Sequence, residues 1–263
     1  MTKTLKGIDV SEHQGMITWS LVKGQISFAI IRAGYGKGHV DKQFRRNVSE
    51  CIKYDIPFGI YWFSYALSKE DAVAEAEYCC ELLNGVPVKY PVAFDWEYDS
   101  DTHAQKYGVL ITNSIRQNIA NAFLSTVKTK GYKPMLYTNA DYLSKGFDVF
   151  LNSGMDIWYA NWSTSVPAYT CKMWQYSATG KITGITGNVD MNIMYETALA
   201  TDTIDDWCND NDVRACLILY NDLAESIIAG RYGTGLQRVE LVKADGYDPM
   251  LAQKIVNYKM KHR

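Results

Sequence analysis

The apolar positions of this 263-residue chain gather in short runs that are rich in β-branched and aromatic residues. Gly, Pro, Asn or Ser bounds each run, which is typical of strands separated by turns. The runs are continuous rather than alternating, and this pattern indicates strands covered on both faces within a parallel sheet. Eight such segments occur, at residues 6–11, 27–34, 57–65, 90–97, 134–139, 156–162, 171–177 and 189–194. The pattern predicts a barrel.

Helical patterns separate the early strands. One apolar face is formed after Asp41 by Phe44, Val48, Cys51 and Ile52. Ser68, together with Asp71, is placed to cap the helical run that follows, and a third helix is expected from about Val109 to Lys130. After Tyr137 the connections shorten and become rich in Asn, Ser, Gly and Thr. We therefore expect an α/β fold, an irregular (β/α)8-type barrel whose later strands lack full crossover helices.

The character of the chain changes around Glu196, where an acidic segment without strand signals leads into helical patterns. We predict a barrel domain over residues 1–197, a linker over residues 198–212 and a small all-α domain over residues 213–263.

Three short helices are expected in this second domain. Gly230 and Gly246 are placed as helix stops. Asp248 followed by Pro249 is placed as an N-cap and first helical residue. A module of about 50 residues is near the lower limit for an independent core. We therefore expect it to lean on the barrel or to form a homo-oligomer with another copy.

Charge and composition exclude several classes of function. The formal net charge is -2, and no Lys/Arg block appears in the first 200 residues, so neither nucleic acid nor a membrane is an expected partner. The start of the chain lacks the apolar core of a signal peptide, and no run approaches the roughly 20 apolar residues of a spanning helix. We expect synthesis in the cytoplasm. The chain has no CxxC, HxxxH or HExxH spacing, so no metal and no cofactor is expected.

Two carboxylates end the strand predicted at residues 90–97. Charges at the edge of a core must be solvated, paired or used. Residues i and i+2 of a strand face the same side, so Asp95 and Glu97 project together while Trp96 faces the other way. Chemistry in eight-stranded α/β barrels lies at the carboxyl ends of the strands. Asp95 and Glu97 therefore form one candidate catalytic pair.

Other predicted strands contribute polar residues to the same mouth. These are Asp9, Asn139, Asp190 and Asn192. Two structural alternatives remain open: Asp9 caps the next segment, or Asp190 pairs with a barrel arginine such as Arg32.

An acidic mouth lined with Trp and Tyr, without metal ligands, suggests cleavage of a glycosidic bond. Glu97 is the candidate acid, with its proton retained because of the neighbouring Asp95 charge and the aromatic walls. Cβ atoms two residues apart on a strand lie roughly 6.5–7 Å from each other, which does not decide the stereochemistry. A D-x-E pair also suits a route in which the substrate's 2-acetamido oxygen attacks and Asp95 orients that amide, with retention of configuration.

Seven segments together resemble glycoside hydrolase family 25, the Chalaropsis-type lysozymes. In order they are KGIDVSEHQG, AIIRAGYG, GIYWFSYA, PVAFDWEYD, PMLYTNADYL, DIWYANW and MWQYSATGKITGITGNVDMN, and the resemblance covers roughly residues 4–195. It implies an irregular barrel and N-acetylmuramidase activity on bacterial peptidoglycan, with cleavage of the β-1,4 bond after N-acetylmuramic acid.

The resemblance also implies roles for particular residues. It places Asp9, Asp95, Glu97 and Asp190 in the acidic mouth, with Glu97 as acid/base. The nucleophilic or amide-orienting role stays divided between Asp95 and Asp190, of which we favour Asp95. Substrate-binding positions are Tyr61, Phe63, Tyr137, Trp158, Gln175, Tyr176 and Arg32, although each aromatic ring is also a candidate packing residue and Arg32 a candidate partner of a carboxylate.

Residues 223–257 separately resemble the CW repeat found at the C-termini of some phage lysozymes. The matching features are GRYGTG, Arg238, the GYD that contains Tyr247, Gln253 and Asn257. The resemblance implies a three-helix wall-binding module, present here in one copy rather than in tandem. The alternative is a helical appendage that dimerises or only stabilises. Together the two resemblances suggest a phage or prophage endolysin that is released through a holin. The alternative is a bacterial autolysin that leaves the cell by another route.

Two other functions remain open from the sequence. One is a protein that binds wall glycan without cutting it, and the other is a hydrolase of chitin-like polymers.

Overall fold

The computed structural model describes residues 3–151, 153–163, 165–196 and 221–245, and residues 249, 252, 253, 256, 259 and 260 beyond them. The chain divides into two compact units, Met1–Ala198 and Leu199–Arg263. The predicted linker, residues 198–212, lies outside the described residues.

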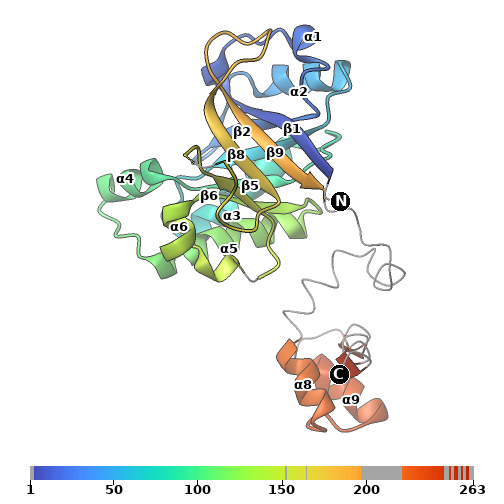
Figure 1. The fold of residues 1–263 in the computed structure, drawn as a ribbon. Coiled ribbons are helices and arrows are strands. Elements are labelled where there is room, and N and C mark those ends of the chain that lie inside the picture. The colour runs from blue at the N-terminus through green and yellow to red at the C-terminus, as the bar shows by residue number, and fades with distance from the viewer. Residues whose placement is uncertain are drawn as a thin grey trace. The chain divides into compact units, whose positions relative to one another are not determined.

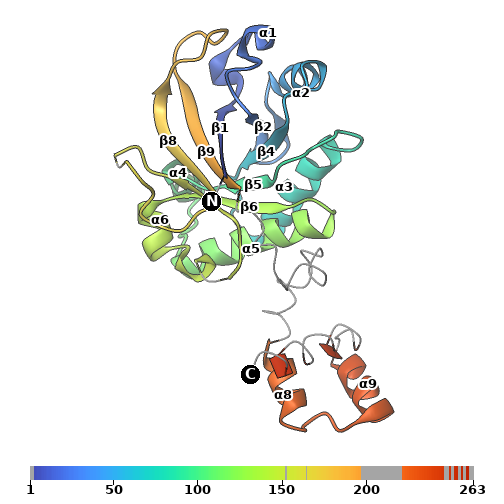
Figure 2. The same ribbon diagram turned by 45° about the vertical axis from the view of Figure 1, so that its right-hand side comes forward.

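The described residues of the first unit form a closed barrel of eight strands (Figures 1 and 2). The strands are β1 (Lys3–Val10), β2 (Phe28–Tyr35), β4 (Phe58–Phe63), β5 (Val92–Asp95), β6 (Pro134–Asn139), β7 (Ile157–Ala160), β8 (Met173–Gly180) and β9 (Val189–Glu196). Their order is β1-β9-β8-β7-β6-β5-β4-β2, and pairing of β1 with β2 closes the ring. A two-residue strand, β3 (His39–Val40), pairs with β2 outside this ring. The structure confirms the predicted barrel.

Strand β9 runs against the other strands. It pairs antiparallel with both β8 and β1, whereas the remaining barrel pairs are parallel. The parallel arrangement expected from the sequence is therefore wrong for this one strand. The reason is the short connection, residues 181–188, since a parallel crossover needs a dozen or more residues.

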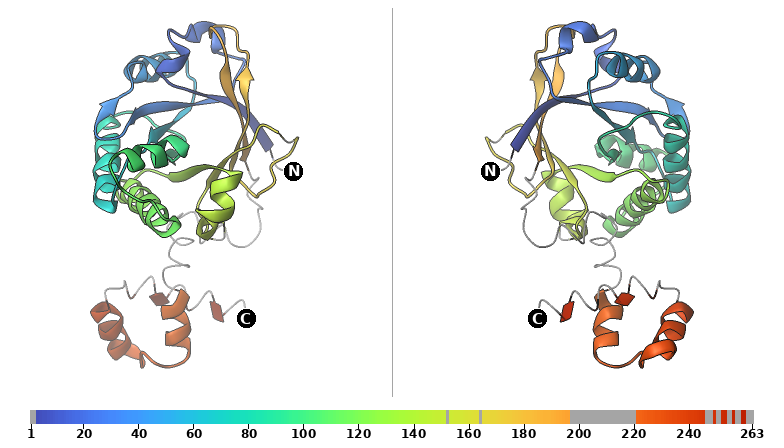
Figure 3. Two further views of the ribbon diagram at one scale, coloured as in Figure 1. Left: turned by 90° about the vertical axis from the view of Figure 1, so that its left-hand side faces the viewer. Right: turned by 90° about the vertical axis from the view of Figure 1, so that its right-hand side faces the viewer.

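The helices of the first unit follow the earlier strands. They are α1 (Trp19–Val22), α2 (Phe44–Lys53), α3 (Lys69–Leu82), α4 (Tyr98–Lys106), α5 (Asn113–Thr129) and α6 (Ala140–Lys145), with single 3-10 turns η1 (Glu12–Gln14) and η2 (Asp148–Phe150). Figure 3 shows helices on the side of the barrel formed by the earlier strands, whereas β8 and β9 carry none among the described residues. No described helix is long and apolar enough to cross a membrane.

Local capping explains where several helices begin. The Ser68 hydroxyl accepts a hydrogen bond from the Asp71 amide at 3.2 Å, which confirms the predicted cap of α3. Helix α5 begins at Asn113 rather than Val109 because Thr112 is its N-cap. In α2 the predicted apolar face is buried except at Ile52, which is 46% exposed.

Side chains on the two faces of the strands form separate apolar clusters. The inner cluster fills the barrel and contains Phe28, Ile30, Ala93, Met135, Tyr137, Trp158, Ala160, Met173 and Met194. The outer cluster lies between the sheet and the helices, and contains Phe94 and Trp96 from β5 and the residue after it. Strand alternation therefore decides which residues of β5 face the barrel interior.

The second unit contains α8 (Asn221–Ile228) and α9 (Gly235–Ala244). Gly230 follows α8 with φ of 82°, a left-handed conformation that ends the helix. The described residues between 249 and 260 all have helical backbone, as a third helix requires. Gly246 and Asp248, predicted at the start of that helix, lie outside the described residues. The core of this unit is formed by Leu223, Ala224, Ile227, Val242, Ala252 and Val256.

Candidate active site

Asp95 and Glu97 lie at the carboxyl end of β5. Asp95 is the last residue of the strand and is 4% exposed, and its Oδ1 atom has no hydrogen-bond partner. Glu97 is the N-cap of α4 and keeps an extended backbone, with φ of −128° and ψ of −176°. Its amide donates to the Ser100 hydroxyl at 3.2 Å. Trp96 between them is 1% exposed and packs in the outer cluster, so the two carboxylates share the opposite side.

Asp9 and Asp190 face each other across the β1–β9 ladder. They are register partners, because Asp9 is near the end of β1 and the antiparallel β9 starts beside it with Asp190 as its second residue. The Asp9 Oδ2 atom accepts hydrogen bonds from Gln175 Nε2 at 2.9 Å and from Asn192 Nδ2 at 2.7 Å. Asp9 does not cap the next segment, since Ser11 is the N-cap of η1.

The surroundings of these carboxyl groups favour their protonated forms. Burial, followed by the charge of Asp190, raises the pKa of Asp9 to about 8. Burial raises the pKa of Asp190 to about 6. Burial also raises the pKa of Asp95 well above its usual range, with the charge of Glu97 as the next cause. Four acids confined to one mouth cannot all carry charge at neutral pH.

Glu97 also has a raised pKa, and the cause differs in part from the one expected. Burial is the largest contribution, and the charges of Asp99 and Asp190 raise the pKa further. A hydrogen bond with Tyr137 acts in the opposite direction. The repulsion between Asp95 and Glu97 that the sequence suggested raises the pKa of Asp95, whereas Asp99 is the main charge that raises the pKa of Glu97.

Arg32 has carboxylate partners other than Asp190. Its Nε atom donates to Asp41 Oδ2 at 2.8 Å, and its Nη2 atom donates to Glu12 Oε1 at 3.1 Å. Arg32 is 8% exposed, so its charge is neutralised inside the fold.

Three predicted aromatic residues meet inside the barrel. The Trp158 ring contacts Tyr137 at a centroid distance of 4.7 Å and Tyr61 at 6.0 Å. The Trp158 indole donates to Asn192 Oδ1 at 2.8 Å and the residue is 1% exposed. Trp158 is therefore a packing residue that holds Tyr61 and Tyr137 in place inside the barrel. Phe63 is the register partner of Asp95.

Gln175 connects the carboxylates to the aromatic residues. Besides its bond to Asp9, its Oε1 atom accepts hydrogen bonds from the Tyr137 hydroxyl and from the Trp162 indole, each at 3.1 Å. Trp162 is 60% exposed, which leaves a ring face open to solvent at the mouth. Sequence reasoning did not select Trp162, although it ends the quoted segment DIWYANW. Tyr176 packs instead with the outer cluster, against Trp174 at 5.6 Å, so the structure does not bring it to the carboxylates.

In the second unit, Arg238 makes contacts within the fold. Its Nε and Nη2 atoms donate to the Gly233 carbonyl at 3.1 and 2.9 Å, and Nη1 donates to Gln253 Oε1 at 3.0 Å. These bonds join the turn after α8 to the third helical segment. Tyr247 and Asn257, also predicted for wall binding, lie outside the described residues.

The described residues contain no group of three or more His, Cys, Asp or Glu that is placed to hold a metal ion. What the mouth offers is proton transfer from buried acids beside the exposed ring of Trp162. An α/β barrel with this set of groups is the framework of a glycosidase.

Comparison with known proteins agrees with this class. The family model of the glycosyl hydrolases family 25 matches residues 8–185, and the CW_7 repeat matches residues 221–260. The chain belongs to glycosyl hydrolase family 25. The predicted resemblances to this family and to a CW repeat are both confirmed.

Relatives of known name support the assignment. Lysozyme M1 of Streptomyces globisporus is 32% identical over 203 residues, which are 73% of this chain and 68% of that protein. The lysozyme of Streptococcus phage Cp-7 is 27% identical over 260 residues, 95% of this chain and 68% of that protein. The structure of the modular autolysin LytC from Streptococcus pneumoniae matches with a TM-score of 0.63 and 29% identity over 73% of this chain, and this chain spans 47% of LytC.

Proposed function

We propose that this protein is a peptidoglycan hydrolase, an N-acetylmuramidase that cleaves the β-1,4 bond between N-acetylmuramic acid and N-acetylglucosamine. The observation that carries the proposal is the pair at the end of β5. Glu97 is half-buried with a raised pKa, and beside it Asp95 has a buried oxygen without a partner. The pair thus supplies a proton donor and a free acceptor on one side of the chain.

The chemistry uses these two groups in turn. Glu97 donates its proton to the glycosidic oxygen as the bond from that oxygen to the anomeric carbon breaks. The oxygen of the substrate's 2-acetamido group bonds to the anomeric carbon. The N–H of the same group donates a hydrogen bond to Asp95 Oδ1, which orients the amide. Water then attacks the anomeric carbon as the bond from that carbon to the acetamido oxygen breaks, and the water gives a proton to the Glu97 carboxylate. Two inversions at one carbon retain the configuration.

Relatives supply the substrate class. The structure of LytC has also been determined with a synthetic peptidoglycan ligand, and this chain is 29% identical to that protein over the matched part. The Streptomyces globisporus protein and the Streptococcus phage Cp-7 protein are both named lysozymes. We infer that this chain acts at the bacterial cell wall during lysis.

Product analysis tests the proposed function. Purified peptidoglycan is digested, the products are reduced with borohydride, and mass spectrometry identifies the reduced sugar. We expect new reduced muramic acid ends. New N-acetylglucosamine ends would favour a chitinase-like enzyme, and no new ends would favour a glycan-binding protein. NMR of the first product from a soluble oligosaccharide reads the anomeric configuration.

The second unit is proposed to hold the enzyme on the wall. A chain that ends after residue 205 should cleave soluble glycan like the full chain and clear whole cells more slowly. Pelleting with purified walls measures the retention directly, and size-exclusion chromatography shows whether the unit instead joins two copies. Equal pelleting of the full and shortened chains would remove the wall-binding role.

A further inference from the structure

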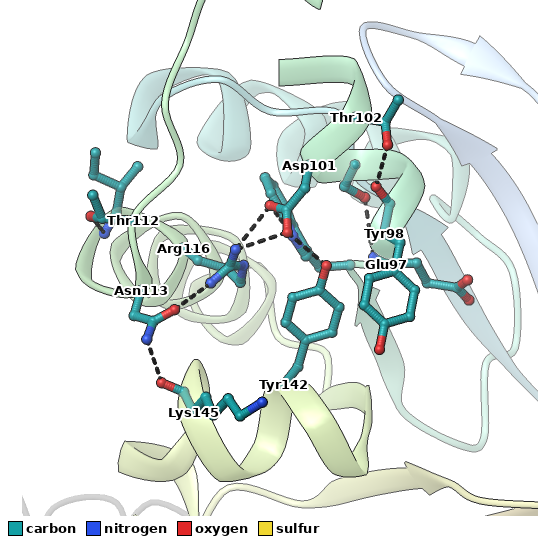
Figure 4. Close-up of polar contacts among 12 residues, drawn as sticks. Glu97, Tyr98, Asp101, Thr102, Thr112, Asn113, Arg116, Tyr142 and Lys145 are labelled. Carbon is teal, nitrogen blue, oxygen red and sulfur yellow. Dashed lines mark hydrogen bonds and ion pairs between the residues drawn. The ribbon is translucent and has the colours of Figure 1, made fainter. Parts of the chain in front are cut away.

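Four hydrogen bonds from three side chains converge on the carboxylate of Asp101, in the first turn of α4 (Figure 4). Arg116 Nη2 donates to both of its oxygens, at 3.0 and 2.8 Å. The Tyr142 hydroxyl donates to Oδ2 at 2.7 Å and the Trp96 indole to Oδ1 at 3.2 Å. We call these four residues the Asp101 cluster. It joins the end of β5 to α4, α5 and α6.

The cluster requires a carboxylate at its centre. Arg116 is 6% exposed and its guanidinium lies 4.9 Å from the centre of the Tyr142 ring, so its charge depends on Asp101 for neutralisation. The Arg116 Nη1 atom donates to Asn113 Oδ1 at 2.8 Å, which fixes the plane of the guanidinium. An asparagine at position 101 would offer one acceptor oxygen to these donors and turn an N–H₂ group toward one of them. Asp101 is therefore not replaceable by its amide without loss of a bond.

The cluster holds the chain on both sides of Glu97. Trp96 is the residue before Glu97, and α4 begins at the residue after it. Figure 4 shows the Glu97 side chain directed away from Asp101 and Arg116, so its carboxyl group does not take part in the cluster. What the cluster fixes is the backbone from which the Glu97 carboxyl projects.

Helix α4 has little buried apolar surface to fix its position. It spans nine residues, and Ser100 and Ala104 are its only buried residues. A polar helix of this length is not stable alone. On another flank the His103 ring stacks on Tyr65 at 4.5 Å, which links α4 to the segment after β4. A second ring contact, between Tyr98 and Tyr142 at 5.1 Å, links α4 to α6. Polar contacts and these two ring contacts therefore position this helix in place of an apolar face.

We propose that the Asp101 cluster positions Glu97 for proton transfer, with Asp101, Trp96, Arg116 and Tyr142 acting as positioning residues. The inference rests on the proposed function, in which Glu97 is the acid. A displacement of about 1 Å in a catalytic group can cost a factor of about 100 in rate. The cluster acts on kcat, because binding of the glycan does not need the Glu97 proton.

Conservative variants within the full chain test the inference. Tyr142→Phe removes one hydroxyl and keeps the ring beneath Arg116, whereas Asp101→Asn weakens every contact of the cluster. We expect kcat on soluble peptidoglycan fragments to fall about tenfold in Asp101→Asn and about threefold in Tyr142→Phe, with KM within twofold of wild type. Circular dichroism confirms folding, and Tyr142→Phe keeps the test valid if Asp101→Asn does not fold.

Two tryptophans provide a matched pair. Trp96→Phe removes an indole donor from the cluster. Trp19→Phe removes a similar donor, which bonds Asn47 Oδ1 at 3.0 Å in the same outer cluster. Both tryptophans are at most 1% exposed. We expect both variants to melt at lower temperature, and only Trp96→Phe to lose kcat.

The pH profile separates positioning from a loss of stability. Burial is the main cause of the raised pKa of Glu97. A loosened α4 lets water reach the carboxyl, so its pKa falls toward the usual value. Activity of an acid is lost as the pH rises through its pKa, so the alkaline limb should move to lower pH in the cluster variants and stay in place in Trp19→Phe.

The outcomes are distinct. If the wild-type protein cleaves no glycan, the proposed function fails and the inference fails with it. If the wild type is active and the cluster variants keep both its kcat and its alkaline limb, the inference alone is overturned. An equal loss of kcat in Trp19→Phe would likewise overturn it, because stability would then explain the effect.

Discussion

The four acids of the mouth form two pairs that differ in depth. Asp9 and Asp95 are 5% and 4% exposed, whereas Glu97 and Asp190 are half-buried. A deep acid exchanges protons slowly with solvent and acts mainly through its charge or its hydrogen bonds. A half-buried acid can reach a glycosidic oxygen and regain its proton from water. The difference teaches that depth, rather than residue type, assigns the roles, and four variants test this division.

The largest loss of turnover is expected from a change at Glu97, one of the two half-buried acids. Glu97→Gln keeps the shape of the side chain and removes the proton donor, so turnover on purified walls should fall by about 1,000-fold or more. Release of reducing ends measures it, and thermal unfolding checks that the fold is kept. A Glu97→Gln protein with normal turnover would remove the proposed mechanism.

Asp95→Asn tests the deep acid with the unpartnered oxygen. The amide side chain keeps an acceptor oxygen but cannot become the carboxylate that would stabilise positive charge on the acetamido group in the transition state, so kcat should fall by about 100-fold. KM should change little, since the charge matters most when the acetamido oxygen attacks. A comparable substrate without the 2-acetamido carbonyl should be cleaved poorly by the wild type and by Asp95→Asn alike. A full loss in Asp190→Asn with normal kcat in Asp95→Asn would transfer the orienting role to Asp190.

Asp190→Asn should have a smaller effect. The Asp190 charge helps to raise the pKa of Glu97, so its removal lowers that pKa. The protonated acid then persists over a narrower range, and the alkaline limb of kcat should move to lower pH with a loss of about tenfold or less at neutral pH. Initial rates across pH 4 to 9 measure the shift. An unmoved limb would mean that the two groups do not interact.

The smallest effect on turnover is expected from Asp9→Asn, whose consequence is in stability. Burial and the charge of Asp190 raise the pKa of Asp9 to about 8 in the fold, from 3.8. The unfolded chain releases the Asp9 proton first as the pH rises, so this group lowers the free energy of unfolding between these values, by at most about 1.4 kcal/mol per pH unit. Urea unfolding measures this effect. From pH 5 to pH 8, the free energy of unfolding of Asp9→Asn should rise relative to that of the wild type. Parallel curves would contradict a protonated Asp9.

The sequence was informative wherever alternation and local bonding decide the structure. Continuous apolar runs located the eight strands, and the i, i+2 spacing placed Asp95 and Glu97 on one side, opposite Trp96. The Ser68 cap depends on residues three apart, so its motif could be read directly.

Features that depend on distant contacts were not visible. The direction of β9 follows from how the ring closes. The pairing of Arg32 with Asp41 and Glu12 depends on contacts of β2 with the segment before α2 and with η1. Helix α4 was missed because its residues are nearly all polar, so it has no apolar face to detect. The role of Asp101 was not predicted either, because its partners come from α5, from α6 and from the residue after β5.

The antiparallel strand β9 limits how the chain can change in length. Asp190 and Asn192 face the barrel interior, whereas Met191 between them packs in the outer cluster. Deletion of one residue within β9 would exchange the two sides and turn both polar groups out of the mouth. A deletion of two residues keeps the same parity, and length changes in the turn at residues 181–188 leave the strand in place. Natural insertions and deletions in this part of the barrel should therefore collect in the turn, or come in pairs within the strand.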